Sequence, residues 1–238
     1  MTHKLVAIGA MLVALTACSN PSPKQAEASK TTDSAAQDKN IVRRPLGMVN
    51  DFTHLLSIGS VNIVYTQGDY SVEVEGDSAM LQYLNASFDS NLLTVSMQND
   101  NNTDINLFGS VSNVTMYLSC PDLKCVSVCG NGGFESKGKW SGDGIEVGVL
   151  GTGTLRLDTV ECNRFKMEVN SVTQIDIANL TAKESIVWTR ASATLNMDVD
   201  VEELSLINDY KPKVTLTGKA VNLMIKNPND ETLLNKIQ

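Results

Sequence analysis

Few residues of this chain have the types and spacing that enzyme chemistry requires. The two histidines are His3, in the N-terminal apolar segment, and His54, in an expected early strand. No nucleophile motif accompanies either residue, so a histidine-based triad has at most one candidate base. The sequence also lacks an HExxH motif, a phosphate-binding loop and a dinucleotide fingerprint. We therefore expect no catalytic residue, no metal site and no cofactor.

Four cysteines lie beyond the N-terminal region: Cys120, Cys125, Cys129 and Cys162. An exported protein permits disulfides, but the sequence alone does not assign a pairing. On one extended strand Cys125 and Cys129 would lie roughly 13 Å apart, which is beyond disulfide reach. The C-x4-C-x3-C spacing of Cys120, Cys125 and Cys129 is a weak match to zinc sites and does not predict one.

The remaining candidates for chemistry are Glu135, Arg156 and Asp176, at intervals of 21 and 20 residues. On stacked coils, Glu135 and Asp176 would lie roughly 9.6 Å apart, within the range for glycoside hydrolysis. Arg156 would stand between them, and opposite charges stacked in this way usually stabilise a sheet. An aromatic content of 5% also leaves few side chains to line a sugar groove. A carbohydrate-active β-helix protein that binds or cleaves polysaccharide is therefore the alternative interpretation.

Cys18 carries the strongest chemical signal in the chain. Residues 1–17 have a charged start, an apolar run and small residues before the cysteine, which is typical of a secretory signal peptide. The run of about 11 residues is shorter than the roughly 20 that span a bilayer. The LTAC tetrad at 15–18 resembles a lipobox, so we expect acylation (palmitate) of Cys18 and anchoring to a membrane. Ser19 in place of Asp favours the outer membrane, at its periplasmic face or at the cell surface.

Residues 18–40 contain this cysteine and then a polar tether. After Cys18 the segment has no aromatic residue and no Val, Ile, Leu or Met, so it cannot offset its ordering entropy. The chain has 19 Lys and Arg against 27 Asp and Glu, a formal net charge of −8. This balance argues against nucleic acid as a partner.

From Ile41 onward apolar and polar residues alternate, as in β-strands. Alternation at 61–65 and 72–75 around a turn at 67–69 predicts a hairpin. Residues 77–85 could form one short helical turn. We expect residues 41–228 to form a single all-β domain.

An internal repeat of about 20 residues follows Pro121. Residues of like size recur every 19 to 21 positions in three ladders: Phe134, Leu155, Ile175, Leu195, Val214; Ile145, Phe165, Ser185, Leu204, Leu223; and Val147, Met167, Val187, Leu206, Ile225. Stacked coils of two short strands explain all three, because equivalent side chains then lie above one another. We predict a right-handed, β-helix-like β-solenoid with coils of about 20 residues. The alternative β-sandwich or barrel would not require like residues at like positions.

The open end of such a stack is an unpaired strand edge. Residues 229–238 could cover it as a short capping helix, with Asn229 or Asp230 at the N-cap. The alternative is a frayed tail.

The same ladder positions place Ile186, Trp188, Ile207 and Met224 on the outer surface of the late coils, whereas earlier coils carry charges there. Contiguous apolar residues on a solvent face favour a contact site, and Trp is enriched at binding hot spots. The alternative is that the tail or the N-terminal strands cover them. We predict a surface for a protein or glycan partner, or for a homo-oligomer.

The ordered set of these motifs resembles the putative auto-transporter adhesin, head GIN domain family of bacterial lipoproteins and secreted proteins. The resemblance covers roughly Arg44 to Asn227. It rests on the strand and turn at 61–69, the strand at 114–118, the Pro-Asp-Leu corner at 121–123, and the Gly-x-Gly turns at 130–132 and 151–153. Later coils lack the glycine pair, so wider turns are expected there. The resemblance implies a solenoid-like fold and a non-catalytic, adhesin-like interaction domain of unknown ligand, and it implies no reaction.

Overall fold

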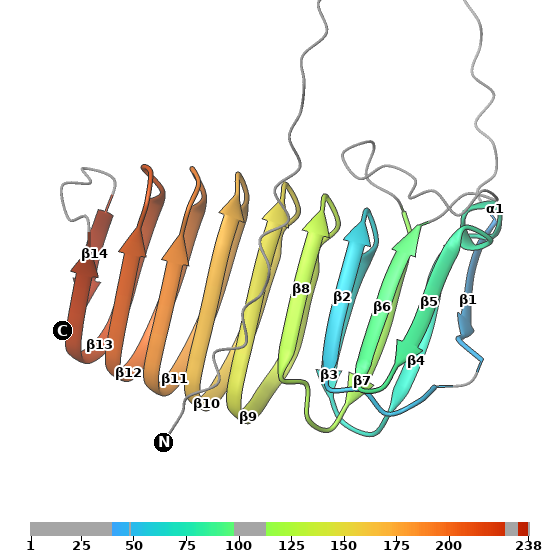
Figure 1. The fold of residues 1–238 in the computed structure, drawn as a ribbon, viewed down its shortest axis with the longest axis horizontal. Coiled ribbons are helices and arrows are strands. Elements are labelled where there is room, and N and C mark those ends of the chain that lie inside the picture. The colour runs from blue at the N-terminus through green and yellow to red at the C-terminus, as the bar shows by residue number, and fades with distance from the viewer. Residues whose placement is uncertain (1–39, 48, 98–112, 227–232, 238) are drawn as a thin grey trace, which may run out of the picture. The chain divides into compact units, whose positions relative to one another are not determined.

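The computed structural model describes residues 40–47, 49–97, 113–226 and 233–237, and residues Lys39–Gln238 form one compact unit. The described part is built almost wholly of β-strands that stack into a solenoid (Figure 1). The predicted all-β solenoid is therefore confirmed. Among the described residues, no helix has the length and apolar character needed to cross a bilayer.

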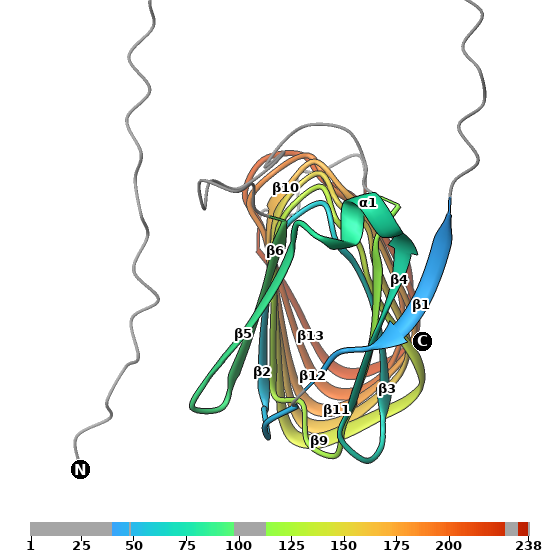
Figure 2. The ribbon, with the colours of Figure 1, turned by 90° about the vertical axis from the view of Figure 1, so that its right-hand side faces the viewer.

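Five long, bent strands each make most of one coil: β9 (Phe134–Gly151), β10 (Leu155–Ser171), β11 (Gln174–Thr189), β12 (Thr194–Asn208) and β13 (Lys213–Lys226). The first part of each strand lies on one wall of the solenoid and the last part on the opposite wall. An end-on view therefore shows a flattened oval (Figure 2). Wall A holds residues 134–137, 155–157, 175–177, 194–197 and 213–217, and wall B holds 145–151, 165–171, 185–189, 204–208 and 223–226.

The strand register stacks the first predicted ladder into one column. Leu155 pairs with Phe134 and Ile175, and Leu195 pairs with Ile175 and Val214. All five side chains are buried. The other two ladders pair in the same way. Burial contributes roughly 25 cal/mol per Å² of apolar area. A single coil cannot bury its own apolar side chains, so this stabilisation comes from its neighbours.

The N-terminal coils are interleaved rather than stacked in chain order. Their strands are β2 (His54–Gly59), β3 (Asn62–Gln67), β6 (Leu92–Met97), β7 (Thr115–Cys120) and β8 (Cys125–Gly130). On wall A β3 lies between β7 and β9, and on wall B β2 lies between β6 and β8. Of these strands, β2 and β3 come first in the chain, and later strands pair with both edges of each.

This interleaving corrects the predicted hairpin around residues 67–69. The second half of that hairpin is β4 (Ser71–Asp77), which pairs antiparallel with β7 and not with β3. Alternation correctly predicted both strands, but β7, which follows about 40 residues later in the chain, separates them.

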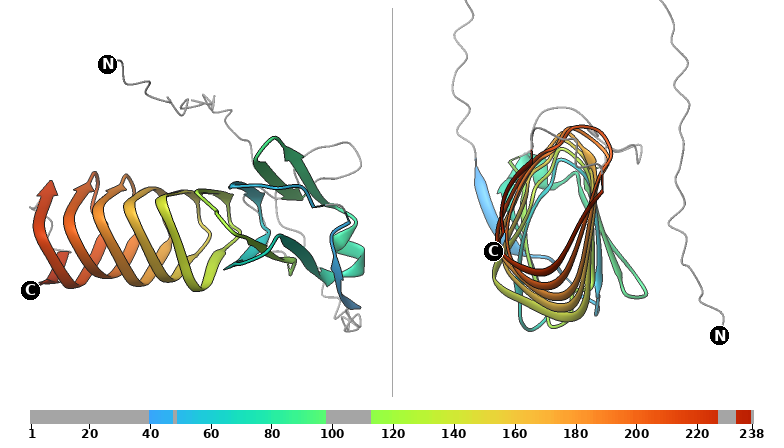
Figure 3. Two further views of the ribbon diagram at one scale, coloured as in Figure 1. Left: turned by 90° about the horizontal axis from the view of Figure 1, so that it is seen from below. Right: turned by 90° about the vertical axis from the view of Figure 1, so that its left-hand side faces the viewer.

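Antiparallel strands close the N-terminal end of the solenoid (Figure 3). β1 (Ile41–Pro45) pairs with β4 on wall A, and β5 (Leu84–Asp89) pairs with β6 on wall B. Between β4 and β5 lies α1 (Ser78–Leu81), the predicted helical turn. Asp77 caps this turn, because its Oδ1 accepts a 2.9 Å hydrogen bond from the Ala79 amide.

Gln67 joins the parts of the chain that the interleaving brings together. Its Nε2 donates to the carbonyl oxygens of Pro121 (2.7 Å) and Ser141 (2.9 Å). Its Oε1 accepts from the backbone nitrogen and the Oγ of Ser141, both at 2.9 Å. Nearby, the buried Trp140 donates from Nε1 to the Leu123 carbonyl at 2.8 Å. The link between β7 and β8 is therefore tied both to β3 and to the bend of β9.

The Gly-x-Gly turns bring backbone very close to backbone. Gly151 has φ 136°, and a Cβ there would lie 2.0 Å from the Gly130 carbonyl oxygen. At Gly153 a Cβ would lie 1.7 Å from the Gly132 oxygen. These positions therefore exclude any side chain.

At the C-terminal end, residues 233–237 form a strand and not the predicted capping helix. This strand, β14 (Leu233–Ile237), pairs in parallel with β13 on wall A, from Val214–Leu233 to Gly218–Ile237. The solenoid thus continues for another half coil beyond the predicted domain boundary at residue 228. Pairing with β14 satisfies backbone hydrogen-bonding groups on the outer edge of β13. A helix at this place would leave those groups of β13 without backbone partners.

Candidate partner-binding surface

The four predicted contact residues come together on the outer face of wall B. Ile186 and Met224 flank Ser205 in one row of register partners, and Trp188 pairs with Ile207 in the next row. Ile186 is 45% exposed and Met224 is 56% exposed, whereas Trp188 and Ile207 are half-buried. We call these four residues the late-coil patch, which spans β11, β12 and β13.

Trp188 is held in one orientation by its neighbours. Its indole Nε1 donates a 2.7 Å hydrogen bond to Asp209 Oδ2. The Arg190 guanidinium lies 3.6 Å from the ring centroid, and Arg190 Nη1 lies 3.3 Å from Glu168 Oε1. Because the ring is already fixed, a partner that contacts it would lose little side-chain entropy.

Neither predicted cover lies over the late-coil patch in the described part of the chain. β14 pairs with residues 214–218 of wall A, whereas the patch lies on wall B. The N-terminal strands β1, β4 and β5 lie at the other end of the solenoid (Figure 1). The half-burial of Trp188 thus has a local cause, the stacked Arg190 side chain.

A second apolar group on wall B was missed by the sequence analysis. Strand alternation turns Leu56, Ile58, Cys129 and Leu150 outward, and Ile58, Cys129 and Leu150 are successive register partners on β2, β8 and β9. Leu150 is 54% exposed. We call these four residues the early-coil group. Charged residues such as Glu146 and Lys166, an ion pair at 3.8 Å, lie between this group and the late-coil patch. The group forms because β2 lies between β6 and β8. The local sequence around β2 does not predict these neighbours.

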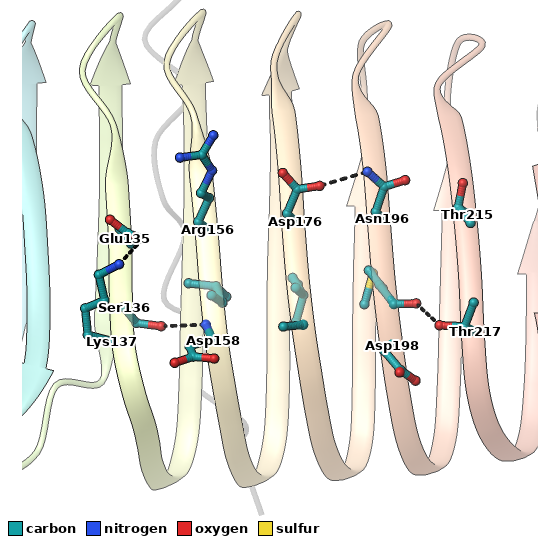
Figure 4. A pocket seen from close by; sticks show the side chains of 14 residues that line it. Glu135, Ser136, Lys137, Arg156, Asp158, Asp176, Asn196, Asp198, Thr215 and Thr217 are labelled. Carbon is teal, nitrogen blue, oxygen red and sulfur yellow. Dashed lines mark hydrogen bonds and ion pairs between the residues drawn. The ribbon is translucent and has the colours of Figure 1, made fainter.

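The charged row on wall A lines a groove with a volume of about 550 Å³ (Figure 4). Glu135, Arg156, Asp176, Asn196 and Thr215 are register partners, as predicted. Asp176 accepts hydrogen bonds from Gln174 Nε2 and Asn196 Nδ2, both at 2.8 Å. Glu135 forms an ion pair with Lys137.

Three carboxylates of this groove, Glu135, Asp158 and Asp176, are each held by a neighbouring group. Asp158 accepts a 2.9 Å hydrogen bond from the Gly138 amide. Among the described residues that line the groove, none is aromatic. The hydrogen bonds from Gly138 to Asp158 and from Asn196 to Asp176 connect neighbouring coils, and nothing here favours the carbohydrate-active alternative.

Cys125 lies beside His54 on wall B. The four described cysteines are free thiols. His54, Cys125 and Glu146 are successive register partners, but burial raises the pKa of the Cys125 thiol, which keeps it neutral. His54 Nδ1 lies 2.8 Å from Thr53 Oγ1 and 3.0 Å from Asn91 Nδ2. Among the described residues no group of three or more His, Cys, Asp or Glu could hold a metal ion.

Comparison with known proteins decides the family. A family model described as "Putative auto-transporter adhesin, head GIN domain" matches residues 51–182, more than half of the chain. The chain belongs to the head GIN domain family. The resemblance seen in the sequence motifs is therefore confirmed. A search of curated proteins finds no match.

Several solved structures share the head GIN solenoid fold. A "putative adhesin" from Bacteroides fragilis NCTC 9343 aligns with a TM-score of 0.61 at 13% identity, covering 84% of this chain and 96% of that one. A "putative adhesin" from Parabacteroides distasonis ATCC 8503 gives 0.51 at 15% identity, with 84% and 96% covered. A "putative lipid binding protein" from the same strain gives 0.51 at 18% identity, with 77% and 83% covered. At these identities the likeness concerns the fold.

The predicted lipid anchor lies outside the described residues. Cys18, the signal peptide at 1–17 and most of the 18–40 tether fall in this region, so lipidation and outer-membrane anchoring stay predictions.

Proposed function

We propose that this head GIN protein is a membrane-tethered interaction module of the bacterial envelope, and that the late-coil patch binds a protein partner. The observation that carries the proposal is the exposed row of Ile186 and Met224 beside an oriented Trp188. The patch places apolar side chains of three successive coils side by side, and contiguous apolar residues on a solvent face favour a contact site. The family description as an adhesin head supports a binding role.

A protein partner fits the patch better than a glycan. Sugar rings stack on exposed aromatic faces, but Arg190 already lies on the Trp188 ring. The other patch residues are aliphatic or contain a thioether, and such side chains pack well against apolar side chains of a protein. Fixed apolar anchors surrounded by charged residues are typical of the core and rim of protein interfaces.

The tether would set where this module acts. We propose that acylated Cys18 holds the module at the outer membrane and that residues 19–40 let it move away from the bilayer. A flexible chain of about 22 residues spans roughly 25 Å, which would place the solenoid just off the membrane. Labelling of cells with radioactive palmitate tests this part, and loss of label in a Cys18→Ala variant is the expected result.

The patch itself is tested by capture from cross-linked envelopes. Wild-type protein is compared with Ile186→Asp and with Leu150→Asp, a matched control that changes an exposed Leu of the early-coil group. We expect Ile186→Asp to lower capture of a defined partner at least tenfold and Leu150→Asp to leave it unchanged, because a desolvated unpaired charge opposes binding. Equal capture by all three proteins, or loss only in Leu150→Asp, would contradict the proposal. A glycan array run beside it detects the glycan alternative.

A further inference from the structure

The C-terminal end of the solenoid is a step rather than a flat surface. The last described strand of wall A is β14, which pairs with residues 214–218. The last described strand of wall B is residues 223–226 of β13, which pair with β12 on one side and with no described strand on the other. Wall A is therefore one strand longer than wall B, and the step is one strand spacing high, about 4.8 Å.

The step leaves core-facing residues of the last coil uncovered. Leu204 and Leu206 of β12 are 1% and 0% exposed, but their register partners Leu223 and Ile225 are half-buried. Val221, at the bend of the same strand, is 79% exposed. Lys226 is the charged residue on this edge of wall B. An unpaired strand with apolar inward positions is a template for pairing with another strand.

We propose that a second copy of this chain fills the step, so that two solenoids join end to end through their C-terminal coils. A two-fold axis parallel to the strands exchanges wall A with wall B. It therefore carries β14 of the second copy into the open position beside residues 221–226 of the first. The same rotation places β14 of the first copy beside β13 of the second, so one operation fills both steps.

Strand direction agrees with this arrangement. The two walls of a coil run in opposite directions, and the two-fold axis leaves the direction of each strand unchanged. β14 of the second copy therefore adds antiparallel to β13. The sheet already accepts antiparallel strands at its other end, where β1 pairs with β4 and β5 with β6. The contact is isologous, so it closes as a dimer and does not propagate into fibres.

The experiment measures self-association of residues Lys39–Gln238, the compact unit, by sedimentation velocity over a thousandfold range of concentration. We expect a reversible monomer–dimer equilibrium in the wild type. Leu223→Lys should weaken the dimer at least a hundredfold, because its charge reaches solvent in the monomer and is buried in the dimer. Leu150→Lys, an exposed site far from the step, should leave association unchanged.

A second variant tests the step itself. A chain that ends at Lys226 lacks β14, so it should be monomeric while retaining the far-ultraviolet spectrum of a β-protein. A wild type that stays monomeric throughout the range overturns the proposal, as does a dimer that survives Leu223→Lys or the truncation. The outcome is independent of the late-coil patch, because Ile186→Asp is expected to dimerise as the wild type does.

Discussion

At the residue scale, Ser185 is the exception among the inward columns. It occupies the second ladder between Phe165 and Leu204, as its spacing predicted. Its side chain is 2% exposed, and its hydroxyl has no hydrogen-bond partner among the described residues. A buried hydroxyl without a partner costs free energy, so this residue weakens the column in which it stands.

We expect Ser185→Ala to raise the free energy of unfolding by about 1 kcal/mol, because it removes a buried polar group that makes no hydrogen bond. The matched control is Ser136→Ala. Ser136 is equally buried, but its Oγ accepts a 3.2 Å hydrogen bond from the Asp158 amide, so its loss should lower stability. Urea denaturation of both variants measures the two signs. Destabilisation by Ser185→Ala would show that its hydroxyl has a partner in solution.

Cys120 predicts how stability depends on alkaline pH. Burial raises the pKa of its thiol from 9.0 to about 11. Its stabilising contribution is therefore complete below about pH 9 and is lost as the pH rises through about 11, because the unfolded chain releases this proton first. We expect the urea midpoint to fall across this interval and to fall less steeply in Cys120→Ala. Parallel curves for the two proteins would mean that Cys120 does not contribute.

At the element scale, local alternation identified strands but not their partners. Both strands of the expected hairpin at 61–75 exist, as β3 and β4, yet β7 lies between them. The turn residues between β3 and β4 did not determine which strand each of them pairs with. β7, from far along the chain, has the same alternating apolar face and pairs with both. The helix predicted at the C-terminus was wrong for a similar reason. The apolar residues of this segment fit a helix as well as a strand, and pairing with β13 decides in favour of the strand.

Gln67 tests the interleaved coils. We expect Gln67→Ala to lower the free energy of unfolding by about 2 kcal/mol, because it leaves polar groups of Ser141 and Pro121 without their partner. Gln174→Ala is the control, since Gln174 donates a single exposed hydrogen bond to Asp176 and should change stability by less than about 0.5 kcal/mol. Thermal and urea unfolding of both variants give the comparison. Equal effects would argue against a special role for the Gln67 contacts.

At the scale of the whole molecule, the strand register could be predicted from the sequence only where the repeat of about 20 residues is present. From Phe134 onward, residues of like size recur in step, and every predicted row appears in the register, the late-coil patch included. Before Phe134 no repeat marks the coils. The early-coil group therefore depends on which strand lies beside β2, a long-range choice that composition and spacing do not encode.

If a partner covers the late-coil patch, it shields Trp188 from solvent, and quenching of Trp188 fluorescence by acrylamide measures this shielding. The chain has 2 Trp residues, of which Trp140 is fully buried and Trp188 is half-buried, so acrylamide should quench mainly Trp188. We predict that saturating amounts of the captured partner lower the quenching constant at least twofold. Unchanged quenching, while sedimentation shows the partner bound, would place the contact elsewhere on the solenoid and rule out the late-coil patch as the binding surface.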